Sequence, residues 1–355
     1  MAHPKVTVLM SVFNGAKYLP VAIESILGQS FADFEFLIID DGSTDDSVSL
    51  IEGYRDPRIR LVRNERNLGL AASLNLGLEI ARGEYVARMD DDDISRPERL
   101  ACQVGFMDAH PAVGVCGSWV RVFPGFDDYI WKFAASSEDI RCRLFYKVGV
   151  AHPAVMLRKK PFAEHSLFYD PAYRAAQDYE LWGRAIRQME FANVQRVLLD
   201  YRIGQGEAAA RNAARQMESV APLRLQRLHE LGVEPTPEQQ QLHETIMNDL
   251  LPADEGALAQ AEVWLLQLEA ANRKSRVYPE LLFARHMCYL WFEFCCRSSD
   301  AGVCSWERYS RSPLFTRAPY SLLERVRFAG AWLARRLKRK GSSSGRQKER
   351  MYDRQ

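Results

Sequence analysis

The sequence predicts an α/β fold with a mainly parallel sheet, followed by an α-helical C-terminal region. Two observations carry this prediction. Short apolar and β-branched runs recur early in the chain, with gaps long enough for one helix between them, at 5–11, 34–40, 59–63 and 84–90. From about Gly206 onward such runs stop, and long helical stretches such as 207–231 and 258–271 follow.

Each early run is followed by a segment that can return the chain to the same edge of the sheet, as parallel strands require. Further along, Pro97 favours a helix start, because proline is common in a first helical turn. Residues 113–123 and 153–158 are strand candidates, and 178–187 is a helix candidate. The Gly- and Pro-containing segment 232–239 breaks the helical region.

These patterns predict three parts. Residues 1–205 form the α/β domain, 206–340 form the helical region, and 341–355 form a flexible basic tail that includes part of the stretch KGSSSGRQKER. The helical region is a candidate for acceptor binding, for homo-oligomer formation or for contact with a membrane surface.

The composition excludes several classes of protein. With 355 residues, 47% of them apolar and 26% charged, the chain resembles ordinary soluble globular proteins. A net charge of +1 argues against nucleic acid as a partner. We find no signal peptide and no run of about 18 apolar residues, which argues against secretion and membrane spanning. Seven cysteines without regular spacing predict reduced thiols in a cytoplasmic protein.

Acidic residues cluster where two of the predicted strands end. Asp40 and Asp41 end the second strand, and the acidic run Asp90–Asp93 follows the fourth. Ligands of open α/β sheets bind beyond the carboxyl ends of the strands, so we expect both clusters to face one crevice. Carboxylates there can accept hydrogen bonds from a nucleotide, and Mn²⁺ or Mg²⁺ would neutralise the remaining charge, since both ions prefer oxygen ligands.

Six segments, in this order, resemble the signature motifs of the family 2 glycosyltransferases, which have the GT-A (Rossmann-like, nucleotide-sugar-binding) fold. The resemblance runs from about Lys5 to Arg202. Its segments are VTVLMSVFNGAKYLPVAIESILGQSF, FEFLIIDDGSTDDS, NLGLAASLNLGLEIARGEYVARMDDDD, HPAVMLRK, QDYELWGRA and LLDYR. The resemblance implies an inverting enzyme that moves a sugar from a nucleotide-diphosphate sugar, a UDP-sugar first of all, to a hydroxyl of a saccharide or lipid-linked saccharide. Bacterial-type cell-surface polysaccharide or glycolipid synthesis is the implied setting.

The resemblance also implies roles for individual residues. Asp178 matches the general base, and Asp92, the second acid of the Asp-X-Asp motif, matches a metal ligand. His152 aligns with a position near the acceptor or the phosphates. The positions implied to contact the nucleotide sugar are Ser11, Val12, Phe13, Asn14, Asp41, Asn67, Asp90 and Asp91.

Structural roles compete with several of these assignments. Ser43, Thr44 and Asp45 are typical helix-capping residues, and so are Asp93 and Ser95. His152 can be a structural histidine. Asp178 can be an acidic residue in the first turn of a helix, where the helix dipole stabilises its negative charge. The family often has a His shortly after the Tyr-Arg dipeptide, but here Tyr201-Arg202 leads into IGQG. Gln205, another side chain, water or phosphate would then take its place.

Two other functions remain open: a nucleotidyltransferase, which also uses paired acids and a cation, and a noncatalytic nucleotide-sugar-binding or membrane-scaffolding protein. The segment 320–340 bears on location. Its apolar residues recur at helical spacing next to a basic cluster, which is typical of a helix on an anionic membrane surface with Trp332 at the boundary. A helix packed on the protein explains the same pattern. We therefore expect a cytoplasmic protein, with a peripheral position at the inner face of the membrane as an open alternative.

Overall fold

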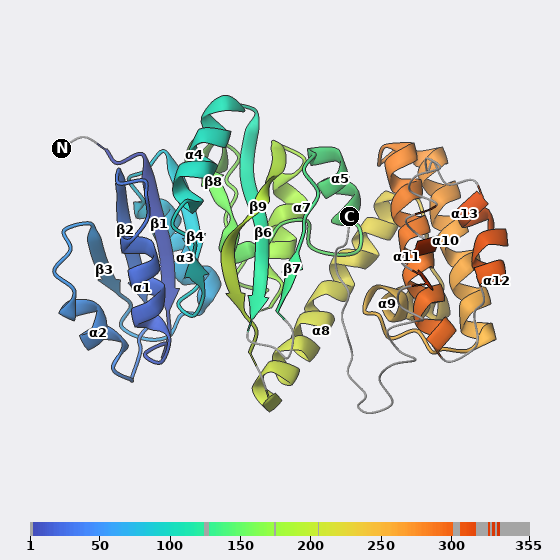
Figure 1. The fold of residues 1–355 in the computed structure, drawn as a ribbon, viewed down its shortest axis with the longest axis horizontal. Helices are drawn as coiled ribbons and strands as arrows, with labels where there is room; N and C mark the ends of the chain where they lie inside the picture. The colour runs from blue at the N-terminus through green and yellow to red at the C-terminus, as the bar shows by residue number, and fades with distance from the viewer. Residues whose placement is uncertain are drawn as a thin grey trace. The chain divides into compact units, whose positions relative to one another are not determined.

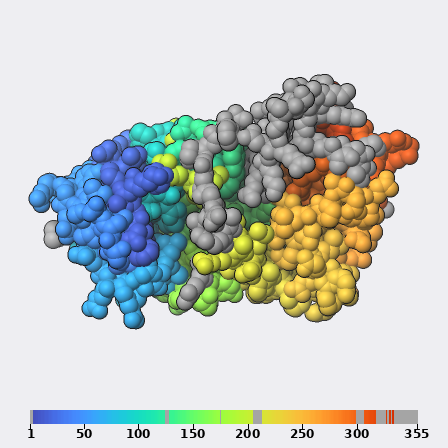
Figure 2. All heavy atoms as spheres, turned by 90° about the horizontal axis from the view of Figure 1, so that it is seen from below, coloured from blue at the N-terminus to red at the C-terminus, as the bar shows by residue number. Residues whose placement is uncertain are grey.

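The computed structural model describes residues 3–123, 128–173, 175–204, 206–300 and 306–316, with Val326, Ala329, Gly330, Trp332 and Leu333. These residues carry colour in Figure 2. The tail predicted at 341–355, Gln205 and Cys304 lie outside them. Two compact units are present, one of residues up to Ile140 with Val148–Val220, the other of Arg141–Lys147 with the chain from Ala221 onward. This division falls inside a helix, whereas the sequence placed a boundary at 205.

The sheet begins with parallel strands, as predicted (Figure 1). Four of its neighbours, in the order β3-β2-β1-β4, are β1 (Val6–Val12), β2 (Phe34–Asp40), β3 (Ile59–Arg63) and β4 (Tyr85–Met89). All of their pairings are parallel. Their carboxyl ends therefore meet at one edge, where the acidic clusters follow β2 and β4.

Helices cover both faces of this sheet. Alternate residues of β1, such as Val6 and Val8, share a core with α1 (Leu19–Leu27). Leu9, which follows Val8 and points to the opposite face in this alternation, meets Gly77 of α3 (Leu70–Ile80). Two further helices are α2 (Ser47–Gly53) and α4 (Arg99–Ala109), and α4 begins two residues after Pro97 rather than at it.

Beyond β4 the sheet becomes mixed, which the sequence did not predict. The order continues β8-β6-β9-β5, with β7 on β6. Of these pairings β6 with β9 is parallel, whereas β4 with β8, β6 with β8, β6 with β7 and β5 with β9 are antiparallel. The strands are β5 (Ile94–Ser95), β6 (Val113–Phe123), β7 (Tyr129–Trp131), β8 (Met156–Arg158) and β9 (Glu190–Arg202).

The remaining elements of this part of the chain are short. They are α5 (Ser137–Arg143), the 3₁₀ turn η1 (His152–Ala154), α6 (Lys159–Glu164) and α7 (Gln177–Ala185). The strand predicted at 153–158 is thus a turn followed by a strand of three residues. The helix predicted at 178–187 is α7, shifted by one to two residues.

The second unit is helical, as predicted. Its helices among the described residues are α8 (Gly206–Glu230), whose first part belongs to the first unit, α9 (Pro237–Met247), α10 (Glu255–Ser275), α11 (Glu280–Asp300), α12 (Trp306–Arg311) and α13 (Pro313–Thr316). Phe145 and Tyr146 of the segment 141–147 pack in its core. None of the helices within the described residues combines the length and apolar character needed to cross a bilayer.

Trp332 does not have the place expected for a membrane-surface helix. Its side chain is only 5% exposed and stacks on Tyr309, with ring centroids 5.9 Å apart. This contact favours the packed alternative, because a tryptophan buried in a protein core is not available to lipid. Val326 and Leu333 are about 60% exposed. The basic cluster at 335–340 lies outside the described residues.

Two helical glycines allow a matched test of the core between α3 and β1. A Cβ at Gly77 would lie 2.2 Å from Leu9 Cδ1, whereas a Cβ at Gly105 of α4 would meet nothing within 4 Å. We expect Gly77→Ala to lower the free energy of unfolding by about 1–3 kcal/mol through overpacking. Gly105→Ala should raise it by roughly 0.5–1 kcal/mol, because alanine is the better helix former. Thermal denaturation of both variants checks this, and equal effects would contradict the packing of α3 on β1.

Candidate active site

Asn14 joins the loops that follow β1 and β2. Its amide donates to Ser43 Oγ (3.0 Å), and its Oδ1 accepts from the Thr44 amide (2.8 Å). Its φ of 54° is left-handed, a conformation that asparagine tolerates. Asp45 accepts from the amides of Ala16 and of Ser47, the first residue of α2. Asp45 thus stabilises the start of α2, in agreement with its possible capping role. Ser43 and Thr44 instead connect the two loops.

Asp41 organises the loop that leads into α3. It is 2% exposed, and its oxygens accept from Asn64 Nδ2 (2.7 Å), the Leu68 amide (2.9 Å) and the Gly69 amide (2.9 Å). A Cβ at Gly42 would lie 2.8 Å from the amide nitrogen of Asn67, so the two loops touch. Asp41 therefore has a positioning role in the structure, and the predicted contact with a base stays a prediction. Asn67 itself is exposed on this loop.

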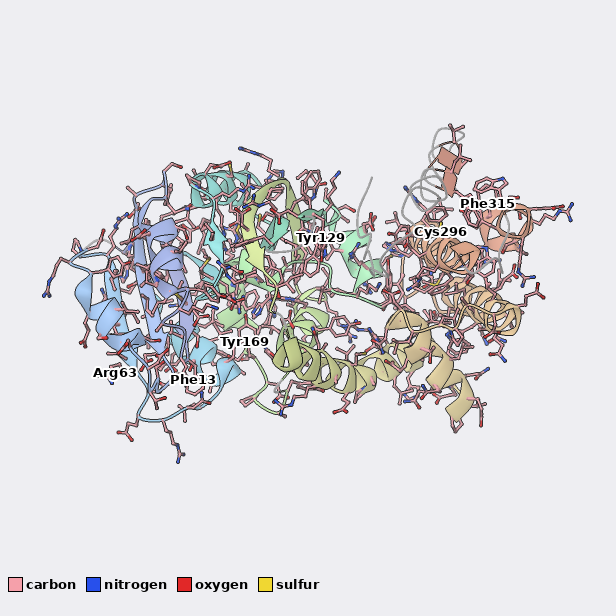
Figure 3. All side chains as sticks on the ribbon, turned by 60° about the horizontal axis from the view of Figure 1, so that its bottom comes forward. Phe13, Arg63, Tyr129, Tyr169, Cys296 and Phe315 are labelled. Carbon is pink, nitrogen blue, oxygen red and sulfur yellow. The ribbon has the colours of Figure 1, made fainter. Side chains whose placement is uncertain are left out.

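The segment after β1 places its residues in different surroundings. Ser11 is partly buried, and Phe13 is 48% exposed. Figure 3 shows Phe13 at the same end of the sheet as Arg63, the last residue of β3. Val12 is fully buried in the core, and its carbonyl oxygen accepts from the Asp41 amide (2.8 Å). The Val12 side chain therefore belongs to the core, and the predicted contact of Val12 with the nucleotide sugar stays a prediction.

Buried arginines underlie the acidic run, and the sequence analysis did not identify them. Arg88 of β4 is 3% exposed, and its Nη1 donates to Asp90 Oδ2 (2.6 Å) while Nη2 donates to Oδ1. Arg99 of α4 is fully buried, and its Nη2 donates to the Arg88 carbonyl (2.6 Å). The chain itself therefore offsets part of the acidic charge, because burial strengthens such pairing.

The neutralisation by arginines is incomplete. Burial and the charges of Asp90 and Asp92 raise the pKa of Asp91 to about 7. Burial and the charge of Asp90 raise the pKa of Asp92 to about 6. The pKa of Asp93 also rises, because of burial and the same neighbours. Carboxyl groups in this state gain from an added cation.

The donor atoms of this run suit such a cation. Oxygens of Asp90, Asp92 and Asp93 all lie within 4.8 Å of one another. Asp93 is fully buried; its Oδ1 accepts from the Arg202 amide (2.7 Å), and its Oδ2 has no hydrogen-bond partner within the described residues. A cluster of carboxylate oxygens fits Mn²⁺ or Mg²⁺. Because Asp93 makes no bond to α4, it does not cap that helix, and it joins Asp92 as a candidate ligand.

The β1 loop lies against this run. A Cβ at Gly15 would lie 2.1 Å from Asp91 Oδ2. Asn14, which precedes Gly15, and Asp91 are both predicted to contact the nucleotide sugar, and they therefore lie on segments that touch. Only a residue without a side chain fits here without displacing the carboxylate.

Asp178 comes from the other part of the sheet. It is the second residue of α7, which follows Ala176 with a left-handed φ of 62°. Burial raises the pKa of Asp178 above its ordinary value, although the Tyr179 amide and Arg88 act in the opposite direction. Arg88 and Asp90 are close enough for electrostatic interaction with it. The structure therefore brings Asp178 and the acidic run to one site, and the amide contact fits the helix-end alternative too.

His152 is next to this site and is already hydrogen-bonded. Its Nε2 lies 2.8 Å from the hydroxyl of Tyr169, labelled in Figure 3, and its ring packs edge-on to Trp182. Tyr169 is held in turn by Asn75, whose side chain bonds both its amide and its carbonyl. Burial and Arg88 lower the pKa of His152 well below its usual value, so the ring is neutral. These contacts favour the structural alternative, and a contact of His152 with acceptor or phosphate stays a prediction.

The role of Asp41 can be tested without an activity assay. Because Asp41 accepts from the amides of Leu68 and Gly69, Asp41→Ala should speed hydrogen exchange of both amides by about tenfold or more. Asp46→Ala is the matched control, since Asp46 is an exposed neighbour whose side chain makes no capping bond. Unchanged exchange in Asp41→Ala would contradict the positioning role.

Comparison with known proteins agrees with this geometry. Residues 7–166 match the family model of glycosyl transferase family 2. An uncharacterized glycosyltransferase of Haemophilus influenzae is 32% identical over 56% of this chain and 66% of its own length. The uncharacterized glycosyltransferase MJ1057 of Methanocaldococcus jannaschii is 35% identical over 57% of this chain and 72% of its own. The UDP-Gal:alpha-D-GlcNAc-diphosphoundecaprenol beta-1,3-galactosyltransferase of Escherichia coli is 33% identical over 59% and 78%.

Solved structures share the fold. TarS 1–349 of S. aureus, solved in complex with UDP-GlcNAc, has a TM-score of 0.53 and 18% identity over 79% of this chain and 91% of its own. The mannosyltransferase PcManGT of Pyrobaculum calidifontis, solved with GDP-Man and Mn²⁺, has a TM-score of 0.50 and 15% identity over 97% and 89%. The predicted fold and enzyme class are confirmed. This chain belongs to glycosyltransferase family 2, a family of transferase enzymes.

Proposed function

We propose that this chain is an inverting glycosyltransferase that moves a sugar from a nucleotide-diphosphate sugar to a hydroxyl group of a saccharide or lipid-linked saccharide. The observation that carries the proposal is that Asp178 of α7 interacts electrostatically with Arg88 and Asp90 at the end of β4. This interaction supports a site that combines a carboxylate for the acceptor with acids for the donor.

Asp178 would act as the general base. A sugar hydroxyl is a poor nucleophile, since its pKa lies far above 7, and a carboxylate within hydrogen-bond reach can accept its proton as the new bond forms. The acceptor oxygen then bonds to the anomeric carbon, and the bond from that carbon to the diphosphate breaks with its electron pair on the departing oxygen. One base opposite one leaving group gives a single displacement, which inverts the anomeric centre. The raised pKa of Asp178 makes it a better base than an ordinary aspartate.

Asp90, Asp92 and Asp93 are the candidate ligands for a divalent cation. When bound, Mn²⁺ or Mg²⁺ supplies positive charge for the diphosphate leaving group. Asp92 is the ligand predicted first, and the unpartnered Asp93 Oδ2 supports an additional one. Mn²⁺ is the ion in the PcManGT structure.

Ser11, Phe13, Asn14, Asn67, Asp90 and Asp91 are the proposed surroundings of the donor. The TarS structure contains UDP-GlcNAc and PcManGT contains GDP-Man, so both nucleotides merit testing, with UDP first. Asp41 would act by holding the loop on which Asn67 lies.

The acceptor and the cellular setting are proposed from the relatives. The name of the Escherichia coli relative gives a lipid-linked acceptor, a diphosphoundecaprenol carrying GlcNAc. A related acceptor here would fit bacterial cell-surface polysaccharide synthesis at the inner face of the membrane. Contact between the C-terminal basic segment and anionic lipid stays a prediction, and the buried Trp332 argues that such contact does not use that ring.

Asp178→Asn tests the general base. Without a carboxylate to accept the proton, transfer should fall by about a hundredfold or more, while donor binding stays within about twofold. The variant should melt no lower than the wild type at pH 8, because it removes a charge that burial disfavours. In the wild type, kcat/KM should fall as the pH drops through an apparent pKa above 3.8, since the base must be ionised.

The alternatives predict other results. Full transfer by Asp178→Asn would refute the assigned base. Transfer of a nucleotidyl group from a nucleoside triphosphate to a sugar phosphate, with release of pyrophosphate, would identify a nucleotidyltransferase. Donor binding without transfer to any saccharide or lipid-linked saccharide would favour the noncatalytic protein.

Metal binding gives an independent prediction. Mn²⁺ at millimolar concentration should raise the melting temperature, because an ion bound only by the folded chain stabilises it. Asp92→Asn should remove most of this shift. Glu79→Gln, an exposed acid of α3, is the control and should keep it. Equal shifts in all three proteins would contradict the proposed ligand.

A further inference from the structure

Arg202, the last residue of β9, is fixed in place beside the acidic run. Its main-chain amide donates to Asp93 Oδ1 (2.7 Å), and its Nε donates to the Asp92 carbonyl oxygen (2.8 Å). The guanidinium carbon lies 4.0 Å from the centroid of the Tyr18 ring and 4.6 Å from that of Phe123. Two aromatic contacts and one hydrogen bond therefore limit the movement of this side chain.

The two terminal nitrogens of Arg202 remain available. Neither Nη1 nor Nη2 takes part in a hydrogen bond or ion pair anywhere in the part of the chain that the structure describes. Nearby arginines differ in this respect. The Nη2 of Arg121, whose guanidinium also lies over Phe123, donates to Asp200 Oδ2 (2.8 Å), and Arg88 is paired with Asp90. Arg202 is thus partly buried, oriented and still short of an anionic partner.

The chemistry of a guanidinium defines that partner. Its paired N–H groups match the spacing of two oxygens on one carboxylate or phosphate group. Arg202 is close enough to Asp92 to lower the pKa of that carboxyl, which places positive charge next to the candidate metal ligands. At the end of a sheet where a nucleotide-diphosphate sugar is proposed to bind, the available oxyanion is the diphosphate.

We propose that Arg202 binds the diphosphate of the donor through Nη1 and Nη2 and stabilises it as it departs. The inference rests on the proposed function. When the bond between anomeric carbon and diphosphate oxygen breaks, its electron pair remains on the diphosphate. The N–H groups of Arg202 then stabilise the added negative charge by donating hydrogen bonds to the diphosphate oxygens. The acceptor proton goes to Asp178. Arg202 thereby supplies a cationic contact in the segment where YRIGQG contains no histidine.

A purely structural role makes a different prediction. The bond from Nε to the Asp92 carbonyl could serve only to hold the acidic run in shape. Loss of Arg202 would then weaken the whole nucleotide site, including the contacts of the nucleoside. A diphosphate ligand role affects phosphate-containing ligands alone, so nucleosides and nucleotides separate the two roles.

The test is calorimetric titration of the full-length chain with uridine, UMP and UDP, first with EDTA and then with Mn²⁺. The corresponding guanosine ligands replace them where the wild type binds GDP and not UDP. We expect Arg202→Gln to weaken UDP binding by about tenfold or more in EDTA and to change uridine binding by less than about twofold. Arg202→Lys should fall between, since it keeps the charge but not the paired donors.

Arg121→Gln is the matched control, because Arg121 shares the Phe123 ring but pairs with Asp200; it should bind all three ligands as the wild type does. Thermal denaturation of each variant checks that it is folded. A parallel loss of uridine and UDP in Arg202→Gln and Arg202→Lys, or unchanged UDP binding, overturns the inference and leaves the proposed function intact. A wild type that binds neither UDP nor GDP refutes the proposed function, and this inference with it.

Discussion

The arrangement of the site depends on the cost of burying several carboxylates side by side. The chain meets part of this cost with Arg88, which pairs with Asp90, and with Arg99, which lies fully buried behind it. The raised pKa values of Asp91 and Asp92 indicate that the compensation is incomplete. A site with this electrostatic deficit favours a cation, and a cation brought together with a diphosphate adds no net positive excess. From the sequence, we expected a bound cation alone to balance the acidic charge. In the structure, the buried arginines of the chain balance part of it.

The same constraint explains why neighbouring loops are fixed. Asn14 bonds to the loop after β2, Asp41 holds the loop before α3, and Gly15 leaves room for the carboxylate of Asp91. Each connection is either a hydrogen bond from a main-chain amide or a close approach at a glycine. Both limit the movement of the loops. Preorganised polar groups of this kind stabilise developing charge without having to reorient during the reaction.

The sequence predicted the parallel half of the sheet well, because β1 and β2 are buried on both faces and read as continuous apolar runs. It missed β9, where Gln195 and Arg196 interrupt the apolar pattern. Alternation along β1 indicates that the Val12 side chain faces the core, as the structure shows, whereas the motif resemblance alone gave no information on its burial. Arg88 and Arg99 left no signal, because a charged residue within a strand or helix does not reveal its burial. Trp332 packs against the protein. Helical spacing of apolar residues predicts one apolar face, but it does not indicate whether that face contacts protein or lipid.

We propose that the acidic run and the diphosphate bind one and the same cation. Electron paramagnetic resonance of free Mn²⁺ measures this directly, in titrations of the chain with and without UDP. If they share it, saturating UDP should tighten Mn²⁺ binding by about tenfold, and Mn²⁺ should tighten UDP binding by the same factor. Equal Mn²⁺ affinity in both titrations would contradict it, because the ion and the diphosphate would then occupy independent sites.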